Sequence, residues 1–258
     1  MDLADFVRWS GYATSVAEAV VLAQLAWFGL TRRYFWLTAF VLSDVLQDAF
    51  AIGATPRSPR YAYDYYAGQA AKLVFAVALS IQLWQLALAA YPALSRFGRR
   101  VLIYLLIGSV LVAAAGLAFE PARSGIHSFT AFPHDFNAFE GAMNLVIVVF
   151  WIAAASFLLW YPVEVSRNVA VFIGGFVFYA LQRRVLLFLL NTYPGSSDVL
   201  SAVTLIFQLC CLIFWIATVR RDGEALKTVT GHRWNPAEAK RLLRQLDEIN
   251  ERLQQMAR

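Results

Sequence analysis

Long apolar segments, separated by short polar breaks, dominate the first 221 residues of the chain. Seven of these segments contain about 20 mostly apolar residues, which is the length that a helix needs to cross the hydrocarbon core of a bilayer. They are residues 11–31, 34–53, 65–91, 101–119, 138–161, 168–190 and 199–219. The strands of a membrane barrel would be about half as long and would alternate between apolar and polar residues. The pattern therefore predicts an all-α, polytopic bundle of seven transmembrane helices over residues 1–221.

A different pattern begins after Arg221. Residues 222–234 are polar, and we interpret them as a linker. Residues 235–258 then carry apolar side chains at alternating intervals of four and three residues, which is typical of the seam of a coiled coil. The seam residues are Leu242, Leu246, Ile249, Leu253 and Met256. We expect a short cytoplasmic helix that joins two copies of the chain into a homodimer, because closed symmetric dimers are the commonest oligomers. Packing of this helix on its own bundle is the alternative.

The composition favours a bilayer as the solvent of the chain. Hydrophobic residues make up 60% of the sequence and charged residues only 15%, whereas a soluble domain carries roughly 25% charged residues. The formal net charge is +5. In a membrane protein, such a basic excess usually belongs to the cytoplasmic loops. The lipid bilayer is therefore the expected partner, and nucleic acid is not.

The distribution of arginines between the loops predicts the orientation. Those that follow spans one, three, five and seven are Arg32, Arg33, Arg96, Arg99, Arg100, Arg167, Arg220 and Arg221. Those on the opposite side are Arg8, Arg57, Arg60 and Arg123. Because basic residues accumulate in cytoplasmic loops, we expect the N-terminus outside and the C-terminus in the cytoplasm, in the inner (plasma) membrane of the cell.

Polar residues interrupt the apolar spans, where charged side chains are costly and usually paired or functional. They are Glu18, Asp44, Asp48, Lys72, Glu140, Asn144, Arg183 and Arg184. With the predicted topology, the charged members fall in the outer half of the membrane. We therefore expect these residues to line an outward-facing polar pocket.

Two interpretations of this pocket stay open. Asp44 and Asp48 share one helix face, and two carboxylates that close cannot both stay ionised cheaply in a low dielectric. Lys72, Arg183 and Arg184 could neutralise acids, but the set contains four acids and three bases, so one acid is a candidate proton-binding group. The residues could form ion pairs that fix helix packing, or a site for a small ligand or ion. Arg184 could instead extend to the membrane surface.

No signature of a known chemistry accompanies these residues. The chain lacks the G-x-S-x-G, H-E-x-x-H and phosphate-loop patterns. The seventh span has no lysine to carry retinal, as in microbial rhodopsins, and the histidines lie outside the spans, unlike those of seven-helix zinc hydrolases. We expect neither a metal nor a cofactor.

Three functions are compatible with this sequence. A receptor-like sensor with a cytoplasmic signalling partner is the leading hypothesis, and an ion-coupled small-molecule transporter or channel that uses Asp44 and Asp48 is the alternative. A membrane enzyme is the third possibility.

Overall fold

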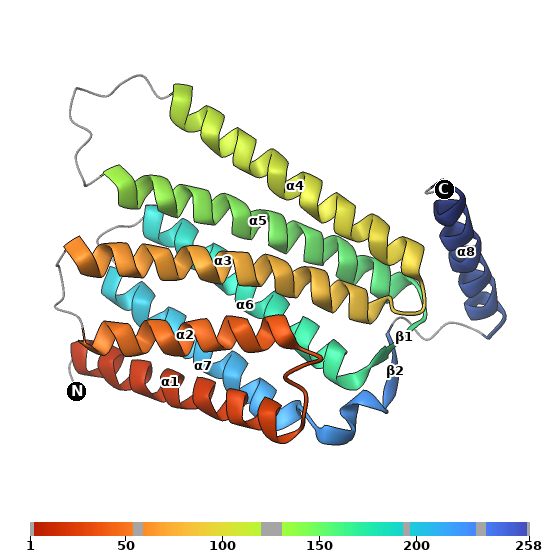
Figure 1. Ribbon diagram of the computed structural model, residues 1–258, viewed down its shortest axis with the longest axis horizontal. Helices are drawn as coiled ribbons and strands as arrows, with labels where there is room; N and C mark the ends of the chain where they lie inside the picture. The colour runs from red at the N-terminus through yellow and green to blue at the C-terminus, as the bar shows by residue number, and fades with distance from the viewer. Residues whose placement is uncertain (1–2, 54–58, 120–130, 193–196, 231–235, 257–258) are drawn as a thin grey trace.

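Seven long helices lie side by side in the computed structural model, and an eighth helix crosses one end of the bundle (Figure 1). The structure describes residues 3–53, 59–119, 131–192, 197–230 and 236–256. The helices in this part are α1 (Leu3–Trp27), α2 (Phe35–Gly53), α3 (Pro59–Ala87), α4 (Pro92–Phe119), α5 (Ala131–Trp160), α6 (Arg167–Thr192), α7 (Ser197–Thr218) and α8 (Pro236–Gln255). A short 3-10 turn, η2 (Arg221–Glu224), and the strands β1 (Val163–Ser166) and β2 (Lys227–Thr230) lie between them. The expectation of an all-helical architecture is confirmed.

Four of the helices are long and apolar enough to cross a membrane, by length and composition. The segments are Tyr63–Ala87 in α3, Phe139–Trp160 in α5, Arg167–Leu186 in α6 and Val199–Thr218 in α7. Large apolar side chains also cover the outside of the bundle: Trp27 is 84% exposed and Tyr104 is 69% exposed. So much apolar surface is unusual for a protein in water and ordinary for one in lipid. The fold is therefore that of a membrane protein in outline, with the bilayer as its partner.

The helix α3 occupies the middle of the bundle. It contacts α2, α4, α5 and α6, while α7 packs between α1 and α6. The half of the bundle nearest the strands is filled by large side chains that are almost completely buried. They are Tyr34, Leu37, Leu79, Leu83, Leu88, Ile147, Trp151, Phe172 and Phe176. The one polar atom of the Trp151 ring is satisfied, because its Nε1 donates a hydrogen bond to Ser80 Oγ at 3.2 Å. This half of the bundle is a closely packed core of mostly apolar side chains.

The strands form a small antiparallel sheet at the end of the bundle where α5 ends and α6 begins (Figure 1). Val163 pairs with Thr230 at one end of the ladder, and Ser166 pairs with Lys227 at the other. The polar sequence of residues 222–234 gave no indication of this sheet. Residues 222–230 of that segment are folded against the bundle, in η2, β2 and the residues between them.

Glu224 ties this segment to the bundle. Its Oε1 accepts hydrogen bonds from Tyr34 Oη at 2.5 Å and from Asn168 Nδ2 at 3.0 Å, and its Oε2 lies 2.9 Å from Arg33 Nε. Tyr34, which directly precedes α2, is completely buried. Its hydroxyl group therefore has Glu224 as its partner in place of water.

The C-terminal helix α8 docks on the beginning of α4. Leu246 is completely buried and Leu242 nearly so, whereas Met256 is 77% exposed. Asn250 Oδ1 accepts hydrogen bonds from the backbone N–H groups of Ala93 and Leu94, at 3.0 and 3.4 Å. These N–H groups lie in the first turn of α4, where a helix has no intrahelical acceptor for them. The expected coiled-coil pairing of two chains is therefore not supported. The most buried part of the seam packs on its own bundle, which was the alternative expectation.

Candidate functional site

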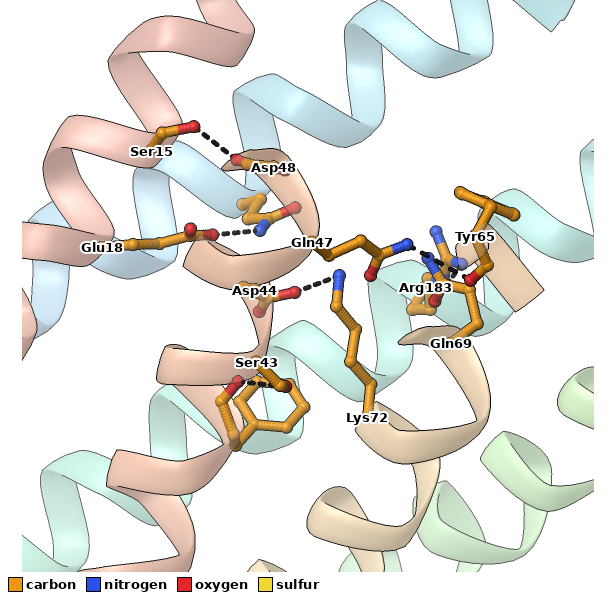
Figure 2. Close-up of polar contacts among 12 residues, drawn as sticks. Ser15, Glu18, Ser43, Asp44, Gln47, Asp48, Tyr65, Gln69, Lys72 and Arg183 are labelled. Atoms are coloured by element: carbon orange, nitrogen blue, oxygen red, sulfur yellow. Dashed lines mark hydrogen bonds and ion pairs between the residues drawn. The ribbon is translucent and has the colours of Figure 1, made fainter. Parts of the chain in front are cut away.

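The polar residues expected from the sequence come together from several helices at the end of the bundle opposite the strands. Figure 2 shows that side chains from α1, α2, α3 and α6 point toward one another there. Two ion pairs organise the group. Lys72 on α3 pairs with Asp44 on α2, and Arg183 on α6 pairs with Glu140 on α5 at 2.9 Å. Ion pairing between helices, one of the two interpretations of the sequence, thus accounts for four of the residues.

Asp44 and Asp48 have different partners although they are one turn apart on α2. Asp44 is buried and pairs with the ammonium group of Lys72. Asp48, nearer the end of α2, accepts a hydrogen bond from the hydroxyl group of Ser15 on α1 (Figure 2). Asp44 and Asp48 therefore do not bind a common partner. Asp44 pairs with a cation, and Asp48 accepts from a neutral hydroxyl group.

The Arg183–Glu140 pair is extended by an amide from α3. Arg183 donates from Nε and Nη2 to Glu140 Oε1, at 3.1 and 2.9 Å, and Nη2 also donates to Gln69 Oε1 at 3.3 Å. Asn144, one turn from Glu140, donates instead to the backbone carbonyl of Glu140 at 3.0 Å. The amide group of Asn144 therefore donates to the backbone of its own helix and not to the ion pair.

Arg184 stands apart from the ion pairs. A Cβ atom at Gly141 would come within 2.9 Å of its Nη1, so the guanidinium group lies closely against α5. Within the described part of the chain, no acid lies at ion-pair distance from Arg184. The structure thus brings together seven of the eight residues expected from the sequence, and places Arg184 beside them without a carboxylate partner.

Glu18 is the buried acid without a cation. It is only 1% exposed, and its Oε1 accepts a hydrogen bond from Gln208 Nε2 on α7 at 2.8 Å. Its other oxygen, Oε2, is buried and has no hydrogen-bond partner among the described residues. Burying an ionised carboxylate without a counter-ion is costly enough that such a group normally binds a proton or a cation.

A small cavity borders Glu18. Its volume is about 10 Å³ for the centre of a water molecule, which is room for roughly one water. Its polar lining consists of Glu18, Asp44, Tyr179, Gln208 and Trp215. Trp215 Nε1 is also buried without a hydrogen-bond partner among the described residues. Two residues that line this cavity, Glu18 and Trp215, thus each carry a buried polar atom without a hydrogen-bond partner among the described residues, and the cavity is too small for an organic ligand.

A glycine on α6 makes this arrangement possible. A Cβ atom at Gly175 would lie 2.2 Å from Trp215 Nε1. Only glycine lets the indole ring of α7 approach α6 so closely. The position of Trp215 at the cavity is therefore set by the backbone of α6.

Three residues of this group, Ser15, Gln69 and Gln208, were not predicted from the sequence. Ser15 and Gln69 each precede an expected site residue, Glu18 or Lys72, by three positions and so share its helix face. That spacing was the available signal. Gln208 belongs to a helix without charged residues between Val199 and Thr218, and nothing in its neighbourhood pointed to Glu18.

Comparisons with known proteins give no further guide. The chain matches no protein-family model, no curated protein and no solved structure. Its function therefore has to be inferred from its own residues.

Proposed function

We propose that the chain is a seven-span protein of the inner (plasma) membrane, with its N-terminus outside and its C-terminus in the cytoplasm. In addition to the four apolar helices, α1, α2 and α4 are 25, 19 and 28 residues long, which is sufficient to cross a bilayer. They pack alongside the other four (Figure 1). In this proposal, residues 1–221 form the transmembrane domain, and residues 235–258 form a cytoplasmic helix joined to it by residues 222–234.

The polar cluster then lies in the outer half of the membrane, and we infer that it makes the protein a receptor-like sensor. The observation that carries this inference is Glu18, a buried residue that lines a cavity of about 10 Å³ and whose Oε2 has no hydrogen-bond partner among the described residues. A cavity of that size admits a water molecule but not a metabolite. The stimulus that it fits is therefore a proton.

Protonation of Glu18 would change the forces between α1, α2 and α7. Neutral Glu18 can donate a hydrogen bond from its free oxygen, whereas the ionised group adds a second negative charge to the cavity that Asp44 also lines. Like charges in a low dielectric repel strongly. Release of the proton should therefore push α1 away from α2 or draw Lys72 toward the cavity.

The apolar core favours a sensor over the alternative, an ion-coupled transporter. Between the cavity and the strands lie the nearly inaccessible side chains of Leu37, Phe172 and Phe176. These buried apolar side chains are unfavourable surroundings for an ion that moves toward the cytoplasm. The surplus of acids keeps the transporter as the second candidate, since acids in spans often form proton relays. A cytoplasmic partner of the sensor would be expected at the end that carries β1, β2 and α8.

Infrared spectroscopy of the purified protein tests the assignment of the proton. A protonated, buried carboxyl group gives a C=O stretching band that is distinct from that of a carboxylate. We expect one such band at neutral pH, which disappears in Glu18→Gln. The matched control is Glu164→Gln, an exposed surface acid whose replacement should leave the band in place.

The result that would contradict the proposal is a band that survives Glu18→Gln, or no band at all in the wild type. Reconstitution in liposomes separates the two functions. A sensor should leave the internal pH unchanged when a pH gradient is imposed, whereas a transporter should dissipate the gradient, and Glu18→Gln should abolish that flux.

A further inference from the structure

A groove opens at the opposite end of the molecule, between the first turns of α4 and the last turns of α8. Its volume is about 220 Å³. The residues that line it are Ala93, Arg96, Phe97, Arg100, Leu253 and Met256. It therefore combines two cations with an apolar surface, and it is separate from the polar cluster of Glu18.

The two arginines of the groove are available to an anion. Arg96 and Arg100 are one helical turn apart on α4, so their side chains are neighbours. Both are exposed, and Arg96 Nε donates to the backbone carbonyl of Pro92 at 3.3 Å. Neither forms an ion pair with an acid in the described residues. Paired guanidinium groups are well suited to phosphate, because each presents several N–H donors in a plane.

The apolar part of the groove continues along α4. Tyr104, Ile107 and Leu111 follow Arg100 at intervals of four, three and four residues, so they lie on the same helix face. All three are exposed. A ligand held at the arginines would therefore find an apolar track that leads toward the middle of the bilayer. A soluble anion would use only the cationic end of this surface.

We propose that this groove binds an anionic phospholipid, with its phosphate between Arg96 and Arg100 and its acyl chains along the exposed face of α4. With the orientation given above, the lipid comes from the cytoplasmic leaflet, whose anionic lipids attract basic residues at the membrane surface. The lipid would touch α4 and α8 at once through Phe97 and Met256. Bound lipid would thus hold α8 in its docked position.

Native mass spectrometry of the detergent-purified protein tests this site. Phosphatidylglycerol and phosphatidylcholine of the same acyl chains are added in separate samples, and glycerol 3-phosphate is added as the soluble anion. We expect the wild type to retain one phosphatidylglycerol molecule in preference to phosphatidylcholine. Arg96→Gln with Arg100→Gln should weaken this retention by roughly 30-fold, since two arginine contacts are lost.

The matched control is Arg99→Gln with Arg244→Gln, which removes two exposed arginines that do not line the groove. It should retain phosphatidylglycerol as the wild type does. Equal loss in both double variants would show a general charge effect and overturn the proposal. So would equal retention of the two lipids by the wild type. Displacement of the lipid by millimolar glycerol 3-phosphate would show that the site recognises a free phosphate and not a lipid.

Discussion

At the scale of single residues, Asp44 and Glu18 show two ways to bury an acid inside a helical bundle. Asp44 pairs with Lys72, and Glu18 has a neutral donor on one oxygen and none on the other. Removal of one partner of a buried ion pair lowers the stability strongly, because the remaining charge is left without a counter-ion. Removal of both charges is much cheaper. This asymmetry gives a direct test of which acids are structural.

Replacement of Asp44 by Asn should destabilise the protein strongly. Lys72 would remain buried without its counter-ion, at a cost of about 3–5 kcal/mol. We expect the free energy of unfolding, measured by denaturant titration in mixed micelles, to fall by this amount. Addition of Lys72→Met to Asp44→Asn should recover a large part of the loss, since no unpaired charge would remain.

Asp48→Asn is the control for this prediction. Ser15 donates the hydrogen bond to Asp48, and the amide oxygen of Asn can accept the same bond. Its effect should therefore stay within about 1 kcal/mol. The prediction would be contradicted if Asp44→Asn and Asp48→Asn lowered the free energy of unfolding equally, or if Lys72→Met restored none of it. Either result would show that the Lys72–Asp44 ion pair does not account for the stability lost in Asp44→Asn.

At the scale of elements, α8 is the helix whose surroundings the sequence left open. Its apolar stripe could face a second copy, the membrane or its own bundle. Leu246 is completely buried against the bundle, and Asn250 accepts from two N–H groups in the first turn of α4. Hydrogen bonds of this kind at a helix start contribute about 1 kcal/mol. The helix α8 is therefore held in place by the burial of Leu246 and by the hydrogen bonds of Asn250 to the first turn of α4.

Leu246→Asp should release α8 from α4, because the substitution places an unpaired charge in an apolar contact. Hydrogen exchange followed by mass spectrometry should show faster exchange at the start of α4, near Ala93 and Leu94, by about 100-fold or more, equivalent to about 2.7 kcal/mol. Met256→Asp, at an exposed position of the same helix, should leave this protection unchanged. Protection that falls on dilution of the wild type would instead reveal pairing between two copies.

The helices could be predicted from the sequence, because each apolar segment is long and its borders are polar. The charged residues in the spans could likewise be expected to meet, since isolated charges are costly in lipid. Which acid meets which base could not be predicted, because it depends on the register between α2 and α3. Glu224 was missed for a similar reason: its partner Tyr34 lies 190 residues away, and its own neighbours look like a linker.

At the scale of the whole molecule, the two ends of the bundle differ in chemistry. The Lys72–Asp44 and Arg183–Glu140 ion pairs lie within one half, and a core of large apolar side chains fills the other. Beyond the core come the sheet, α8 and the arginines at the start of α4. Because anionic lipids and the positive-inside rule both favour arginines in the cytoplasm, the orientation connects the three proposals: an outer proton site, an inner lipid groove and a cytoplasmic α8.

The orientation can be tested with reporter fusions in a bacterial host. Green fluorescent protein joined to the C-terminus should fluoresce, because it matures in the cytoplasm, and alkaline phosphatase at the same position should be inactive. Phosphatase inserted between α2 and α3, at residues 54–58, should be active outside. Replacement of Arg96, Arg99 and Arg100 by Gln should increase the fraction of chains with the opposite orientation, since these three arginines lie together in the first turns of α4, at its cytoplasmic end in this orientation. Active phosphatase at the C-terminus of the wild type would reverse the orientation and move the polar cluster to the cytoplasmic half of the membrane.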